Sequence, residues 1–250
     1  MRISGFEIKT EEALISWFHT KQFEFECLKG EKNKYIQDVY RQIVTHMPAS
    51  KISKGIYYRA RIIEQSDGEE TGIIRKNNIP ITGYNVQYSS IAPPEKITAN
   101  GRVNRIGEPV LYLAEDIETS CKELKASEDA YISVAECLIN NTIKVMDFTA
   151  TVSGELEGLF SDAAVHLFGD KQLGDIRAFY MNFKKYLTAP DYKSQDYVIP
   201  LNFLDIVKER TDISGIKYSS FYTEKCNIAL WDENRNKECT NSRVVKNLNQ

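Results

Sequence analysis

The run from Gly55 to Ile63 constrains the fold most, because it is rich in β-branched and aromatic residues and such runs form strands. Strand side chains alternate between two faces, so Arg59 and Arg61 are expected on the same face. Residues 64–108 hold most of the turn-forming residues of the chain, which predicts long loops with short strands. Long loops within a compact domain are often functional. This part of the chain is therefore predicted to be a charged strand followed by a loop region that can carry a site.

After residue 108 the pattern changes between strand and helix several times. Pro109–Ala114 is predicted to be a short buried strand, and Asp116 to cap a helix whose apolar residues follow at helical spacing. The other expected elements are strands at 131–139 and 142–148 joined by a hairpin turn at Asn140-Asn141, helices within 155–188, a helix around 200–210, strands at 214–219 and 226–231, and a polar tail from Asp232. Residues 1–50 are predicted to be helical, chiefly from the apolar spacing of residues 33–47.

The composition is that of a globular protein, with 42% hydrophobic residues, 27% charged residues, 13 Gly and 7 Pro in 250 residues. The 32 Lys and Arg against 35 Asp and Glu argue against a nucleic-acid backbone binder or a basic membrane-surface protein. No apolar run is long enough to cross a bilayer, and the first thirty residues are too acidic for a signal peptide. We therefore expect a cytoplasmic protein with neither nucleic acid nor membrane as a partner.

The five cysteines form no C-x-x-C pair and are odd in number. This pattern predicts buried or incidental thiols instead of a disulfide framework. The three histidines are scattered, so no metal site is expected. The sequence also lacks a G-x-x-x-x-G-K-[ST] phosphate loop, a G-x-G-x-x-G turn, an H-E-x-x-H helix and a G-x-S-x-G elbow. Side chains would therefore have to hold the phosphates of a bound nucleotide, and arginine suits that task.

The segment N-G-R-V-N-R-I-G-E-P-V-L-Y-L-A at residues 100–114 resembles the RES domain, a family known from bacterial toxin–antitoxin modules. Tyr112 follows Arg102 by ten residues and Glu123 follows Tyr112 by eleven, as in the family pattern. Other parts of the pattern are met by Asn104, Gly107, Tyr58-Arg59, Tyr218-Ser219-Ser220 and Asn227. The resemblance covers about residues 55–232. Asn100 and Val103 depart from it, because many members have Gly and Trp there, and the 97 residues between Glu123 and Ser220 are more than in compact members.

The resemblance implies an α+β fold like that of ADP-ribosyltransferases, a mixed β-sheet core with flanking helices, here with a helical N-terminal extension. It divides the chain into the extension at 1–50, the RES domain at 51–232 and a polar tail at 233–250. It also implies an enzyme that cleaves NAD⁺ between nicotinamide and ribose, with water or inorganic phosphate as acceptor and no prosthetic group. Such an enzyme is toxic, so an antitoxin protein is an expected partner. Residues 1–50 could instead be a built-in cover or the surface of a homodimer.

In this reading Glu123 stabilises the oxocarbenium-like ribose. Arg102 and Arg59 would grip the diphosphate, and Tyr112 would lie against the nicotinamide ring. The remaining ligand contacts are assigned to Asn104, Ser220 and Asn227.

Each of these residues also has a structural interpretation, such as a solvated helix flank for Glu123. Arg61 competes with Arg59, and Glu115, Asp116 and Glu118 compete with Glu123. The alternative functions are a protein mono-ADP-ribosyltransferase and a non-catalytic interaction module with the same fold.

Overall fold

The computed structural model describes residues 40–41, 44–45, 47, 49–90, 97–149, 180, 183–188, 200–231, 239 and 242–246, and the backbone alone of 2–3, 6–7, 198–199 and 237–238. The chain divides into two compact units. The first unit comprises residues 1–49, 99–105 and 146–213, and the second comprises residues 50–98, 106–145 and 214–250. Helices and strands both contribute to the described part, so the predicted mixture of α and β structure is confirmed.

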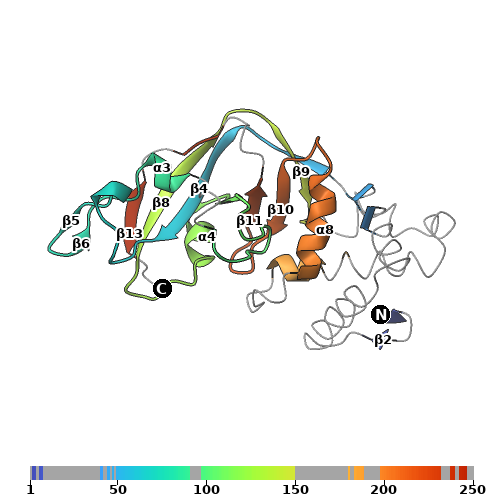
Figure 1. Ribbon diagram of the computed structural model, residues 1–250, viewed down its shortest axis with the longest axis horizontal. Coiled ribbons are helices and arrows are strands. Elements are labelled where there is room, and N and C mark those ends of the chain that lie inside the picture. Colours follow the sequence, from blue (N-terminus) through green and yellow to red (C-terminus); the bar gives the residue numbers. More distant parts are fainter. Residues whose placement is uncertain are drawn as a thin grey trace. The chain divides into compact units, whose positions relative to one another are not determined.

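A large sheet forms the core of the second unit (Figure 1). Among the described residues it has nine strands, and the path of neighbours is β12-β8-β4-β7-β11-β10-β9-β3, with β13 also paired to β8. Its strands are β3 (Ala49–Ile52), β4 (Gly55–Ile62), β7 (Leu111–Ala114), β8 (Tyr131–Ile139), β9 (Ile143–Asp147), β10 (Gly215–Ser219), β11 (Cys226–Leu230), β12 (Lys237–Cys239) and β13 (Arg243–Lys246). The strands expected near 55–63, 109–114, 131–139, 142–148, 214–219 and 226–231 are therefore confirmed.

Short elements surround these strands. They are a 3-10 helix (Glu69–Thr71), the paired strands β5 (Arg75–Lys76) and β6 (Ile79–Pro80), α3 (Val86–Ser89), α4 (Ile117–Lys122), α8 (Val198–Lys208) and the paired strands β1 (Arg2–Ile3) and β2 (Phe6–Glu7). Asn77 and Asn78 connect β5 to β6 with φ angles of 52° and 63°, the left-handed conformation that a two-residue hairpin turn needs. The predicted loops with short strands and the helix around 200–210 are thus present.

Side chains on one face of the sheet form a hydrophobic cluster. Its buried members are Ile52, Leu111, Leu113, Cys137, Ile139, Ile143, Val145, Ile228, Leu230 and Cys239. Burying an aliphatic side chain of this size stabilises the fold by about 1.5–3 kcal/mol. The first unit has its own aromatic core, in which the Phe183 ring lies 4.8 Å from the Phe203 ring and 4.9 Å from the Phe148 ring.

The predicted hairpin between residues 131–139 and 142–148 is wrong. The neighbours of β8 are β4, β12 and β13, whereas β9 lies between β10 and β3. The eight residues of β4 from Gly55 to Ile62 pair with β8 along one edge, and the two C-terminal strands pair along the other. Both edges of β8 are therefore occupied, and Asn140-Asn141 begins a connection to another part of the sheet.

The segment expected to be a polar tail contributes β12 and β13 to the sheet. Cys239 lies opposite Cys137 in that pairing, and the two form a disulfide, so the expectation that the cysteines are all unpaired thiols is wrong. Cross-strand contact, not sequence spacing, brings this pair together, since the two cysteines are 102 residues apart.

The helical N-terminal extension and the helices within 155–188 lie mostly outside the described residues. The described residues 40–41, 44–45, 180 and 183–188 are helical. No helix within the described ranges has both the length and the apolar character that crossing a membrane requires.

Candidate functional site

Helix α4 places Glu123 at its C-terminal end. The helix begins after Asp116, whose Oδ1 accepts a hydrogen bond of 2.7 Å from the backbone N–H of Thr119. This is the N-cap that the sequence predicts, and such a cap stabilises a helix by about 1 kcal/mol. The backbone N–H of Glu123 donates to the Thr119 carbonyl at 3.2 Å, which fixes the residue as the C-cap. The Glu123 side chain is therefore held at a defined position beside the sheet.

The Glu123 carboxylate is bound by two of the other predicted site residues. Its Oε1 accepts a hydrogen bond of 2.6 Å from the Ser220 hydroxyl and one of 2.7 Å from the Asn227 amide Nδ2. Hydrogen bonds to an ionised acceptor are short and about twice as strong as neutral ones. Ser220 and Asn227 are 8% and 5% exposed, so both partners are held in a dry environment. Three residues from two distant parts of the sequence thus form one polar cluster, which we call the Glu123 cluster.

Two strands position the donors of the Glu123 cluster. Asn227 lies on β11, opposite Ala114 of β7 and Tyr218 of β10. Ser220 follows the end of β10, and its backbone N–H donates to the Lys225 carbonyl at 2.9 Å. The Ser220 hydroxyl also accepts the Tyr222 N–H at 3.1 Å while it donates to Glu123. The strand end and the loop therefore determine the hydroxyl direction.

The second carboxylate oxygen of Glu123 differs from the first. Within the described part of the chain, Oε2 accepts no hydrogen bond, and the side chain is half-buried. A carboxylate with one oxygen fixed and the other accessible can accept a hydrogen bond from a ligand hydroxyl or stabilise a cationic centre. This is the chemistry that the Glu123 cluster supports.

The competing carboxylates each have a structural partner. Glu115 binds the Lys217 ammonium at 3.1 Å through Oε1 and the Cys226 N–H at 3.1 Å through Oε2. Glu118 pairs with Lys122 one turn along α4 at 2.6 Å. Asp116 is the helix cap. Glu123 is thus the carboxylate of this region that is bound to Asn227 and Ser220.

Tyr112 lies on the same face of the sheet as Asn227. Residues directly opposite in neighbouring antiparallel strands share a face, and so do residues two apart in one strand. Asn227 is opposite Ala114, and Tyr112 precedes Ala114 by two residues. Tyr112 is half-buried. The register therefore places its ring on the face of the Glu123 cluster.

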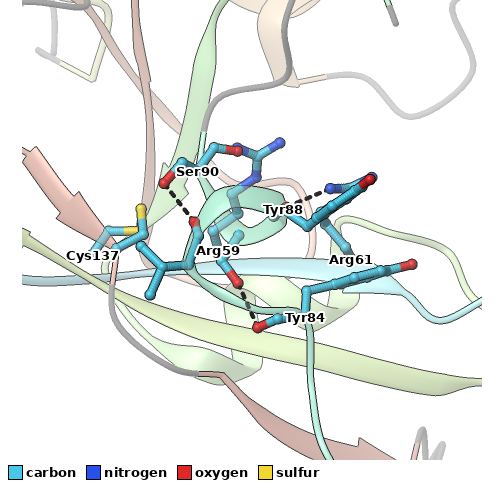
Figure 2. Close-up of a disulfide and its surroundings, with 9 residues drawn as sticks. Arg59, Arg61, Tyr84, Tyr88, Ser90 and Cys137 are labelled. Carbon is cyan, nitrogen blue, oxygen red and sulfur yellow. Dashed lines mark hydrogen bonds between the residues drawn. A yellow bond between two sulfur atoms is a disulfide. The ribbon is translucent and has the colours of Figure 1, made fainter. Parts of the chain in front are cut away.

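Arg59 lies on the opposite face. Its neighbour Tyr58 is opposite Ala114, so Tyr58 shares the face of Asn227 and Arg59 does not. Arg59 and Arg61 share the other face, as predicted, and their guanidinium groups donate to the backbone carbonyls of Ser90 and Tyr88 (Figure 2).

The Arg61 guanidinium also lies 4.7 Å from the Tyr84 ring centre, close enough for a cation–π contact. Burial and the neighbouring Arg61 lower the pKa of Arg59 to about 10. Both arginines hold the segment from Tyr84 to Ser90 against the sheet, and the structure does not bring Arg59 to the Glu123 cluster.

Arg102 and Asn104 belong to the first unit. The Arg102 guanidinium donates to the Leu187 carbonyl at 2.5 Å, and the Arg102 carbonyl accepts the Tyr186 hydroxyl at 2.9 Å. Asn104 is 7% exposed, and its side-chain amide donates to the Arg105 carbonyl at 3.0 Å. The two Arg102 bonds hold the loop at residues 101–105 to the helical residues 183–188, and the Asn104 bond lies within the loop.

Sequence reasoning missed two features near the Glu123 cluster. Tyr58 was noted only as a neighbour of Arg59, although it shares the face of Asn227. The hydroxyls of Thr119 and Thr223 are 2.8 Å apart and join α4 to the loop between β10 and β11. Strand alternation separates Tyr58 from Arg59, but only the pairing of β4 with β7 shows which of the two faces carries the cluster.

Comparison with known proteins decides the family. The RES domain model matches residues 78–247, more than half of the chain. The chain belongs to the RES domain family. This family match continues past residue 232 and includes β12 and β13.

The RES chain was also compared with solved structures and curated proteins. It is similar to a chain of the crystal structure of the M. tuberculosis MbcT–MbcA toxin–antitoxin complex, with 12% identity, a TM-score of 0.42, and coverage of 83% of this chain and 92% of that one. A search of curated proteins gave no match.

Proposed function

We propose that this RES-domain protein cleaves NAD⁺ at the bond between nicotinamide and ribose. The observation that carries the proposal is the Glu123 carboxylate, held by Ser220 and Asn227 through one oxygen while the other accepts no hydrogen bond from the described residues. Family membership supports it, because the residues that the family model matches, 78–247, include Glu123, Ser220 and Asn227. NAD⁺ is the substrate, and the reaction needs no prosthetic group.

The proposed step is a substitution at the ribose carbon. The C–N bond to nicotinamide breaks, and its electron pair leaves with nicotinamide, which becomes neutral. A water or phosphate oxygen then bonds to the same carbon, and a water acceptor releases a proton. The transition state has oxocarbenium character. A fixed carboxylate stabilises such charge, and removing a fixed electrostatic group of this kind typically costs 10²–10³-fold in kcat.

The other predicted residues take supporting roles in this proposal. Tyr112 lies on the cluster face and would pack against the nicotinamide ring. Arg102 would bind the diphosphate, because arginine pairs well with phosphate oxygens, and Asn104 would be a further contact to NAD⁺. For Arg59 we propose a positioning role, since its guanidinium holds the Ser90 carbonyl on the opposite face.

Loss of NAD⁺ would harm the cell that makes the protein. We therefore expect a neutralising antitoxin protein as a partner. NAD⁺ is a cytoplasmic cofactor, so the proposed reaction also places the protein in the cytoplasm.

The test is release of nicotinamide from NAD⁺ by the purified full chain. We expect Glu123→Gln to lower kcat at least about 100-fold, because the amide removes the negative charge but keeps the size. Glu118→Gln is the matched control, since Glu118 is on the same helix and pairs with exposed Lys122. It is expected to keep wild-type activity.

Two results would overturn the proposal. One is a wild-type protein that releases no nicotinamide, and the other is a folded Glu123→Gln variant with wild-type kcat. Adding phosphate, and separately labelled NAD⁺ with cell lysate, identifies the acceptor. Label on protein would make the enzyme a mono-ADP-ribosyltransferase.

A further inference from the structure

The loop between β10 and β11 carries an exposed aromatic side chain directly after Ser220. Phe221 is 59% exposed, and among the described residues it is the only exposed aromatic side chain. A single exposed apolar residue is normal on a protein surface. Its position is what matters here, because neighbouring Cα atoms are about 3.8 Å apart and the preceding residue binds the Glu123 carboxylate.

The loop that carries Phe221 is fixed at several points. Besides the Ser220 and Tyr222 hydrogen bonds of the Glu123 cluster, the Thr223 hydroxyl contacts Thr119 of α4 and accepts the Lys225 N–H at 3.2 Å. The Phe221 ring packs on the half-buried Tyr222 ring, with centroids 5.3 Å apart and planes at 83°. A side chain held in this way loses little further freedom when it binds a ligand.

We propose that Phe221 is a second ring, besides Tyr112, against which the nicotinamide of NAD⁺ stacks. This proposal rests on the proposed cleavage at Glu123. Glu123 acts at the ribose that bears nicotinamide, so a side chain beside Ser220 is near that base and not near the adenine beyond the diphosphate. The nicotinamide ring of NAD⁺ is flat and cationic, and an aromatic face attracts both features. Phe221 is thus a specificity residue for the charged ring.

The test compares substitutions at Phe221 in the full chain by steady-state nicotinamide release. We expect Phe221→Ala to raise the KM for NAD⁺ about tenfold, which lies within the range for losing one base–aromatic stack. Phe221→Trp keeps a π face and should stay within about twofold of wild type. Phe221→Leu keeps apolar area without the π face and should resemble Phe221→Ala. Ile79→Ala removes another exposed apolar side chain, 48% exposed in β6, and should leave KM unchanged.

Binding by equilibrium dialysis separates this proposal from the proposed reaction. In the Glu123→Gln background, NAD⁺ is not consumed, and adding Phe221→Ala should weaken its binding about tenfold. An unchanged Kd or KM for Phe221→Ala overturns the stacking proposal, and so does an equal loss for Ile79→Ala. If the wild type releases no nicotinamide, the reaction is refuted. Equilibrium dialysis of NAD⁺ with the wild type and with Phe221→Ala then tests the stacking proposal independently of the reaction. A wild type that does not bind NAD⁺ overturns the stacking proposal as well.

Discussion

At the residue scale, the contributions of the two hydrogen-bond donors, Ser220 and Asn227, can be measured separately from that of the Glu123 carboxylate. We expect Ser220→Ala and Asn227→Ala each to lower kcat about 10- to 100-fold with little change in KM, because each removes one of the two donors that orient Oε1. A hydrogen bond to a charged group contributes about 1.5–3 kcal/mol. The double variant should approach the loss of Glu123→Gln. Steady-state kinetics of nicotinamide release measure all three.

Thr223→Val is the control for these two variants. It removes a hydroxyl of the same loop, the one that contacts Thr119 of α4, but leaves both donors to Glu123. If it loses as much kcat as Ser220→Ala, the activity depends on the loop as a whole, and the assignment of Ser220 as a carboxylate donor fails. Circular dichroism shows whether each variant is folded.

The same residues show how far sequence reasoning reaches at this scale. The spacing of Glu123, Ser220 and Asn227 in the family pattern predicts that they belong together, and their side chains do meet. The alternation in Gly55–Ile63 predicts that Arg59 and Arg61 share a face. It does not say which face, because that depends on the pairing of Tyr58 with Ala114, and such pairing is set by contacts between distant segments.

At the element scale, the disulfide connects the C-terminal strand β12 to β8. It closes a loop between residues 102 apart, and a loop of this length corresponds to about 4–5 kcal/mol of stabilisation in the chain-entropy model. We therefore expect reductant to lower the Tm of the wild type by about 10 °C. Cys137→Ala/Cys239→Ala should show the lower Tm with and without reductant. Thermal unfolding followed by circular dichroism measures both.

Cys121→Ser controls for thiol effects, because Cys121 lies outside the disulfide and is half-buried. Its Tm should respond to reductant as the wild type does. A wild-type Tm that is the same in both conditions would show that the disulfide contributes nothing to stability. Cytoplasmic thiols are kept reduced. If the protein acts in the cytoplasm, as proposed, its reduced form must therefore be stable enough to stay folded there.

The errors at this scale have one physical cause. Strands at 131–139 and near 142–148 were correctly predicted from local residue types, but their pairing was not, because β8 is occupied on both edges by segments far away in sequence. The same long-range pairing places Cys239 opposite Cys137, which no cysteine spacing could indicate. Local sequence specifies a strand, whereas its partner depends on competition among all the strands of the sheet.

At the scale of the whole molecule, the predicted site residues are divided between the two units. Arg102 and Asn104 belong to the first, and the Glu123 cluster belongs to the second. Neither unit alone contains the complete predicted set, so tests of function need the full chain. The RES domain match also includes residues of both.

Expression of the full chain from an inducible promoter in bacteria tests whether turnover suffices for toxicity. At a typical kcat of about 10 s⁻¹, about 1 µM enzyme converts about 1 mM substrate in about 100 s, which is far shorter than a cell division. We expect the wild type and Glu118→Gln to stop growth and lower cellular NAD⁺ at least about tenfold. Glu123→Gln at the same protein level should do neither. Growth arrest at normal NAD⁺ that Glu123→Gln abolishes would indicate a protein mono-ADP-ribosyltransferase. Equal arrest by Glu123→Gln would mean that the chain acts by binding a partner, as a non-catalytic module would.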